Sequence, residues 1–143
     1  GERRLLGFKQ AAEVFQLDCP PNWCIDAGWD EKEAYQKTIE FIRGGQRPEV
    51  IFAFNDEMAI GCIRALQDML LKVPEDISVI GMDDIDRSAL TNPSLTTVHR
   101  PLCELGEIAA GALLGMMRGE ESRKIILPTS LIQRESCIKN WAK

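Results

Sequence analysis

Two short apolar runs, VIFAF at 50–54 and ISVI at 77–80, restrict the possible folds more than any other feature of the sequence. The first run is apolar at every position, so it predicts a strand buried on both faces, as in a parallel sheet covered by helices. Between the two runs, apolar residues recur at helical spacing: Ala59, Ile63, Leu66 and Leu70. A helix between two such strands indicates a parallel strand–helix–strand unit.

The segment before this unit contains two further helices. The first is predicted to end near Asp18 by the spacing of Leu5, Phe8, Ala12 and Phe15. The run at 23–26 is interpreted as a short strand. Asp30 precedes Glu33 by three residues, as in a capping box, and the helix that it opens is expected to end at Gly44-Gly45.

The segment after the unit continues the alternation. Residues 81–93 are polar and irregular, and 95–98 are expected to be extended. A helix is predicted from Pro101 to Gly119, followed by short strands at 125–127 and 130–133. This order of elements predicts an α/β fold, with a Rossmann-like parallel sheet flanked by helices.

Composition excludes several classes of function. A length of 143 residues suits one domain or lobe, and a net charge of −5 argues against a nucleic-acid-binding surface on this segment. Five cysteines without a C-x-x-C pattern, and a single histidine, make no plausible zinc site, and unpaired cysteines favour the cytoplasm. No apolar run approaches about 18 residues, so no membrane partner is expected.

Polar and aromatic side chains follow the predicted strands, where open α/β sheets bind ligands. An aromatic ring stacks on the face of a sugar, carboxylates and amides bind hydroxyl groups, and arginine donates bidentately. The chain therefore suits a small polyhydroxylated ligand, with these candidate contacts: Arg4, Trp29, Asn55, Asp83 and Arg100. There is no histidine beside a nucleophile and no metal cluster, which argues against an enzyme. No glycine-rich nucleotide motif is present, so no cofactor is expected.

Several of these polar residues also have a purely structural interpretation. Trp29 can close the edge of the core, and Arg4 and Arg100 can be surface charges. Asp84 and Asp86 lie in the irregular segment and are interpreted as solvated turn residues.

Asn55 and Asp56 stand together where the first apolar run meets the helix. One polar residue is enough to cap a helix, and Asp56 is expected to do so, as Asp30 does for its own helix. Asn55 then remains for the ligand.

Six segments, in this order and at these spacings, resemble the effector-binding region of the LacI/GalR family of bacterial transcription regulators. They are RRLLGFKQA (3–11), PEVIFAFNDEMAIGCIRAL (48–66), VPEDISVIGMDD (73–84), NPSLTTVHRP (92–101), LGEIAAGALL (105–114) and LIQRES (131–136). The resemblance implies a type I periplasmic-binding-protein-like domain of two lobes, with a small-molecule effector in the cleft between them.

The resemblance also implies how the chain is divided. Residues 1–100 would form the C-terminal lobe, 101–121 a crossover helix that belongs to the N-terminal lobe, and 122–143 the returning strands and the tail. The helix-turn-helix that binds operator DNA would lie outside this segment. A homodimer is expected, with contributions from the helix that starts near Met58 and from 87–92. Leu70 stands where a helix-ending glycine is common in the family, at a cost of about 1 kcal/mol if the left-handed conformation is kept.

The family's ligand contacts correspond to Arg4, Trp29, Asn55 and Asp83. Arg100 stands at a hinge position where glutamine is common in the family, and the additional cation favours an acidic sugar or a phosphorylated effector. Sugars, sugar acids and nucleoside-like molecules are the expected effector classes.

Three functions follow from these observations. The first is the effector-sensing lobe of a DNA-binding repressor or other regulator, and the second is a sugar-binding protein of a transport system. A helix-turn-helix at the N-terminus of the full-length protein would support the first, and a signal peptide the second. The third, an α/β enzyme, lacks a catalytic constellation.

Overall fold

The computed structural model describes residues 2–121 and 124–137. The α-helices are α1 (Glu2–Val14), α2 (Glu31–Arg43), α3 (Asp56–Asp68) and α4 (Leu102–Met117). The strands are β1 (Val50–Phe52), β2 (Ser78–Asp83), β3 (Thr96–His99) and β4 (Ser130–Ile132). Two short 3-10 helices, η1 (Pro21–Trp23) and η2 (Asp86–Ala89), complete this part of the chain.

The strands form one sheet in the order β1-β2-β3-β4. The first three strands are parallel, and β4 pairs antiparallel with β3 because the chain returns from α4 in the opposite direction. The predicted α/β fold with a parallel-dominant sheet is confirmed. In the register of the sheet, Asp83 at the end of β2 pairs with His99 at the end of β3.

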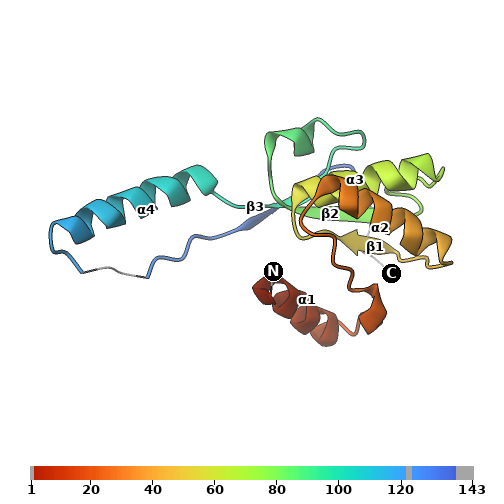
Figure 1. Cartoon of the computed structure of the whole chain (residues 1–143), viewed down its shortest axis with the longest axis horizontal. Coiled ribbons are helices and arrows are strands. Elements are labelled where there is room, and N and C mark those ends of the chain that lie inside the picture. Colours follow the sequence, from red (N-terminus) through yellow and green to blue (C-terminus); the bar gives the residue numbers. More distant parts are fainter. Residues whose placement is uncertain (1, 122–123, 138–143) are drawn as a thin grey trace.

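The core lies between the sheet and the pair α2 and α3, which pack side by side (Figure 1). Its largest fully buried side chains include Ile42, Leu66 and Val79. The two helices approach closely at Gly61, where a Cβ atom would collide with the backbone carbonyl of Glu31. α1 lies apart from this pair and contacts β1 through Phe8, whose ring stacks on Phe52 at a centroid distance of 5.9 Å.

α4 extends away from the rest of the molecule, together with the segments that lead to and from it (Figure 1). None of its residues is buried, although its sequence is rich in leucine, alanine and methionine. Among the described residues, no helix is both long and apolar enough to cross a membrane.

Three predicted strands differ from the structure. Residues 23–26 are not a strand, because Pro20 and Pro21 start a 3-10 turn in which the Trp23 N–H donates to the Pro20 carbonyl at 2.9 Å. Residues 125–127 are also not a strand. The strand at 50–54 exists but is not buried on both faces: β1 is an edge strand, and Val50 is 45% exposed.

The predicted ends of α2 and α3 are well defined. Asp30 accepts the Glu33 N–H at 2.9 Å, which confirms its role as a cap, and Gly44 ends α2. After α3, Leu70 has a φ of 60°, so the left-handed conformation is kept without a glycine. The Leu71 N–H donates to the Leu66 carbonyl and the Leu70 N–H to the Gln67 carbonyl, each at 2.9 Å, which makes a Schellman motif.

Candidate functional site

The five predicted ligand residues lie in one cluster. Arg4, from the first turn of α1, donates to the carbonyl of Phe54 just after β1 and to Asp83 Oδ1 at 3.1 Å. Its guanidinium carbon lies 5.4 Å from the centroid of the Trp29 ring, a cation–π contact. Residues from four separate parts of the chain thus meet at the carboxyl ends of β1 and β2.

Trp29 does not close the core as its structural interpretation required. It is 44% exposed and follows Gly28 in a turn where both residues have a positive φ. One face of its ring is near Arg4, and its ring centroid lies 6.5 Å from that of Phe54. An exposed indole held in a turn beside a polar cluster is suited to stacking on a ligand.

Asp83 is the centre of the cluster. Its Oδ1 accepts from the Arg4 guanidinium at 3.1 Å and from the Arg100 guanidinium at 2.6 Å. The interpretation of the two arginines as simple surface charges is therefore wrong. Asp83 has a φ of 120°, and Asp84 a φ of 56°, conformations that cost energy in residues other than glycine. Such strain is concentrated at functional sites and switch regions of proteins.

Asn55, and not Asp56 as expected, is the residue that caps α3. Asn55 is the N-cap of α3, and its Oδ1 accepts the Met58 N–H at 2.7 Å. The helix starts one residue earlier than predicted, so Asp56 occupies its first position and its side chain turns inward. The Asn55 amide also donates to the Trp29 carbonyl at 3.3 Å, which joins Asn55 to the cluster.

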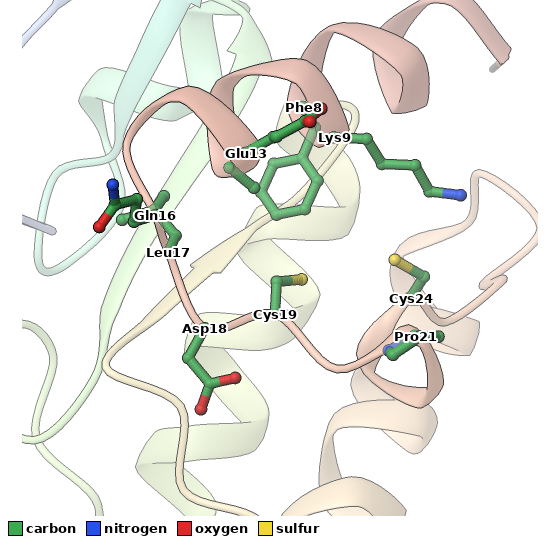
Figure 2. Close-up of a pocket in the computed structure, with 10 residues that line it drawn as sticks. Phe8, Lys9, Glu13, Gln16, Leu17, Asp18, Cys19, Pro21 and Cys24 are labelled. Atoms are coloured by element: carbon green, nitrogen blue, oxygen red, sulfur yellow. The ribbon is translucent and has the colours of Figure 1, made fainter.

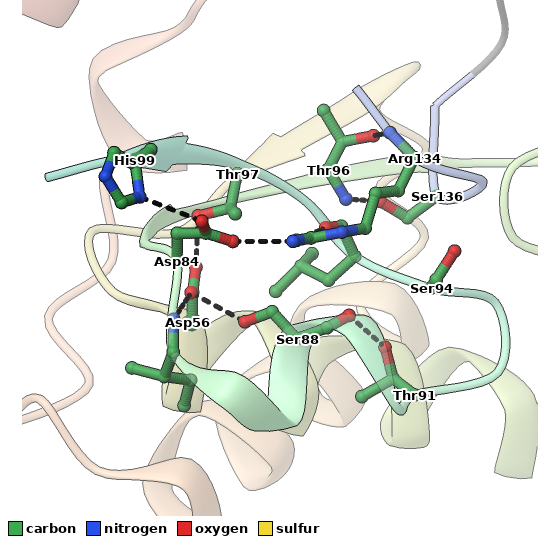
Figure 3. Close-up of polar contacts among 12 residues, drawn as sticks. Asp56, Asp84, Ser88, Thr91, Ser94, Thr96, Thr97, His99, Arg134 and Ser136 are labelled. Carbon is green, nitrogen blue, oxygen red and sulfur yellow. Dashed lines mark hydrogen bonds and ion pairs between the residues drawn. The ribbon is translucent and has the colours of Figure 1, made fainter. Parts of the chain in front are cut away.

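Asp56 is only 1% exposed and accepts three hydrogen bonds (Figure 3). The donors are the Ile85 N–H at 2.9 Å, the Ser88 hydroxyl at 2.6 Å and the Thr97 hydroxyl at 2.5 Å. These donors belong to the loop after β2, to η2 and to β3. Asp56 therefore ties the start of α3 to β3, which Arg100 follows, and to the segment after β2, which ends at Asp83.

Asp84 is not a solvated turn residue, so its interpretation from the sequence is wrong. Its carboxylate pairs with Arg134 at 2.7 Å and with His99 Nδ1 at 2.9 Å (Figure 3). Burial acts to raise the pKa of Asp84, but the hydrogen bonds and charges of Arg134 and His99 outweigh it, so the pKa lies below its ordinary value. Asp86, by contrast, is exposed at the start of η2.

Arg134 connects the returning segment to the sheet. Besides Asp84, its guanidinium donates to the Leu95 carbonyl at 2.8 Å, and its backbone N–H donates to the Thr96 hydroxyl at 2.9 Å. Arg134 and Asp84 thus hold together the two segments that lead to and from α4. Sequence reasoning did not find this role, although both residues lie in motifs that carry the family resemblance.

Two hollows lie away from the centre of the cluster. The larger one, about 660 Å³, is bordered by the C-terminal half of α1 and the loop to η1, and includes Phe8, Cys19 and Cys24 (Figure 2). The smaller one, about 160 Å³, lies where α4 begins and is bordered by Arg100, Leu105 and Leu127. The larger hollow contains none of the five predicted ligand residues.

Residues 1–137 match the sequence pattern of the family of periplasmic binding protein-like domains, so the chain belongs to this family. Among curated relatives, it is 36% identical over 138 residues to the HTH-type transcriptional repressor PurR of Klebsiella pneumoniae. That alignment covers 95% of this chain and 40% of the repressor, so the chain spans less than half the length of such relatives.

Among solved structures, regulators of the LacI family are similar to this chain. A lac repressor dimer bound to operator and the anti-inducer ONPF superposes with a TM-score of 0.86 at 29% identity, over 94% of this chain and 47% of the repressor. A LacI family transcriptional regulator from Enterococcus faecium with bound ribose gives 0.84 at 34% identity, over 94% and 50% of the two chains. The resemblance to the effector-binding region of LacI/GalR regulators is thereby confirmed.

Proposed function

We propose that this chain is the effector-sensing lobe of a LacI-type transcription regulator, and that it binds a small polyhydroxylated molecule at the cluster around Asp83. The single observation that carries the proposal is that these residues gather in one cluster: Arg4 and Arg100 pair with the Asp83 carboxylate, Trp29 lies against Arg4, and Asn55 donates to the Trp29 carbonyl. The repressors among its relatives and the ribose in a structural neighbour support it.

Each residue has a distinct role in the proposal. Trp29 stacks on the apolar face of the ligand, and Arg4 donates to its oxygens. The Oδ2 of Asp83, which has no partner within residues 2–121 and 124–137, accepts from its hydroxyl groups. Asn55 uses one lone pair for Met58 and one N–H for Trp29, so a second lone pair and a second N–H remain for the ligand.

The domain division expected from the resemblance forms part of the proposal. In the proposal, residues 1–100 form the C-terminal lobe, 101–121 cross to an N-terminal lobe, and 122–143 return and form the tail. Residues 1, 122–123 and 138–143 of this division lie outside the described part of the chain. The exposed apolar surface of α4 supports the crossing, because a helix of this composition needs a partner to cover it. Ligand binding would shift the closure of the two lobes and so change the affinity for operator DNA, through a helix-turn-helix outside this segment.

The regulator is proposed to be a cytoplasmic homodimer. Leu70 after α3 and Leu90 after η2 are strongly exposed, which supports an interface between α3 and residues 87–92 of two copies.

A transport binding protein of the same fold is the alternative. The repressors among the relatives favour regulation, and the N-terminus of the full-length protein discriminates between the two.

A thermal-shift screen of sugars, sugar acids and nucleosides on the full-length protein tests the proposal, because a ligand that binds only the native state raises the melting temperature. The shift should disappear in Asp83→Asn, which removes the charge but keeps the shape and tolerates the positive φ. Glu75→Gln, at an exposed carboxylate in the loop before β2, is the matched control and should keep the shift. Loss of the shift in both variants, or in neither, would contradict the proposed site.

A further inference from the structure

We propose that the ligand is an anion, a polyhydroxylated molecule with a carboxylate or a phosphate group, and that Arg100 selects it. This inference rests on the proposed function of the cluster and names the chemical class of its ligand.

The balance of charge in the cluster is the first observation. Two guanidinium groups, of Arg4 and Arg100, face one carboxylate, that of Asp83, and both use the same oxygen. The cluster therefore has one positive charge in excess, and a bound anion would neutralise it.

Among the described residues, the neighbouring carboxylates do not pair with Arg4 or Arg100. Asp84 is paired with Arg134 and His99, and Asp56 is buried with its oxygens occupied by Ile85, Ser88 and Thr97. Asp30 caps α2 through the Glu33 N–H.

The Arg4 side chain has more contacts within the described residues than the Arg100 side chain. Arg4 is fixed by the Phe54 carbonyl, by Asp83 and by the Trp29 ring. Within residues 2–121 and 124–137, the Arg100 guanidinium pairs only with Asp83, and its side chain is 34% exposed. Since a guanidinium has five N–H donors, most donors of Arg100 are available to a ligand.

The position of Arg100 suits an anionic group at one end of a ligand. It directly precedes the N-cap of α4 and shares Asp83 Oδ1 with Arg4. A ligand whose hydroxyl groups bind Asp83 and whose face stacks on Trp29 would place its charged end against Arg100. Carboxylates and phosphates accept two parallel hydrogen bonds from a guanidinium, which neutral hydroxyl groups match poorly.

Isothermal titration of the full-length protein with three matched ligands tests this inference: ribose, ribonate and ribose 5-phosphate, with a second set made of glucose, gluconate and glucose 6-phosphate. In at least one set, the acid or the phosphate should bind about tenfold more tightly than the neutral sugar, or more, as expected for a charge-assisted hydrogen bond. The acid and the phosphate arms show which anionic group is preferred. The preference should decrease in Arg100→Gln and persist in Arg43→Gln, an exposed arginine in the last turn of α2.

Other results would overturn the inference. Equal or tighter binding of the neutral sugars refutes it and leaves the proposed function intact. Equal binding of inorganic phosphate refutes the role of the hydroxyl groups. Binding of neither neutral nor anionic compounds contradicts the inference and the proposed function together. An anion preference that survives in Arg100→Gln refutes the assignment of selectivity to that residue.

Discussion

The buried carboxylate of Asp56 should contribute far more to stability than the helix cap next to it. In Asp56→Ala, the Ile85 N–H and the Ser88 and Thr97 hydroxyls lose their acceptor in a site that is 1% exposed. A hydrogen bond to a charged group contributes about 1.5–3 kcal/mol, but the two hydroxyls can rotate toward other acceptors. We therefore expect a loss of about 3–5 kcal/mol, less than the sum of three such bonds because the hydroxyls can find other partners.

The matched variant is Asn55→Ala, at the adjacent position. It removes the hydrogen bond to the Met58 N–H, and the loss of an N-cap costs about 1 kcal/mol. Urea denaturation of the full-length protein, followed by circular dichroism, measures both changes in the free energy of unfolding. If Asp56→Ala costs no more than Asn55→Ala, the inward orientation of Asp56 is refuted.

Two further predictions concern Leu70 and Asp84. In the monomer, Leu70→Gly should raise the free energy of unfolding by up to about 1 kcal/mol, because Leu70 is 91% exposed and has a φ of 60°. A lower melting temperature than that of the native protein, with both proteins kept monomeric, would contradict this. The folded-state pKa of Asp84 is lowered, so its carboxylate stabilises the fold above the ordinary pKa of 3.8 and loses that contribution as the pH falls through the folded pKa. Asp84→Asn should thus be less stable than the native protein at neutral pH, and denaturation curves of the two should converge in acid; a difference that is independent of pH would refute the role of its charge.

The repeated patterns in the sequence predicted most of the fold. The apolar runs at 50–54 and 77–80 correspond to β1 and to part of β2. The residues between them with helical spacing of apolar side chains correspond to α3. These predictions succeed because each depends on a pattern of several apolar residues, although β1 is an edge strand and not buried on both faces. The strand at 23–26 fails because two consecutive prolines impose a turn that periodicity does not detect.

The roles of single polar residues were harder to predict. Asn55 and Asp56 are both good N-caps, and a shift of one residue in the start of α3 makes Asn55 the cap and buries Asp56. The pairing of Asp84 with Arg134 joins residues 50 positions apart, so local sequence gives no sign of it. The cluster itself was predictable, because the carboxyl ends of neighbouring parallel strands meet at one edge of the sheet.

A crystal structure of the full-length protein, with the compound that raises its melting temperature most, tests the central claim most directly. We expect the ligand between Trp29 and Asp83, with Arg4, Asn55 and Arg100 within hydrogen-bonding distance. A ligand bound in the hollow beside Cys19 and Cys24, without contact to Asp83, would contradict the proposed site.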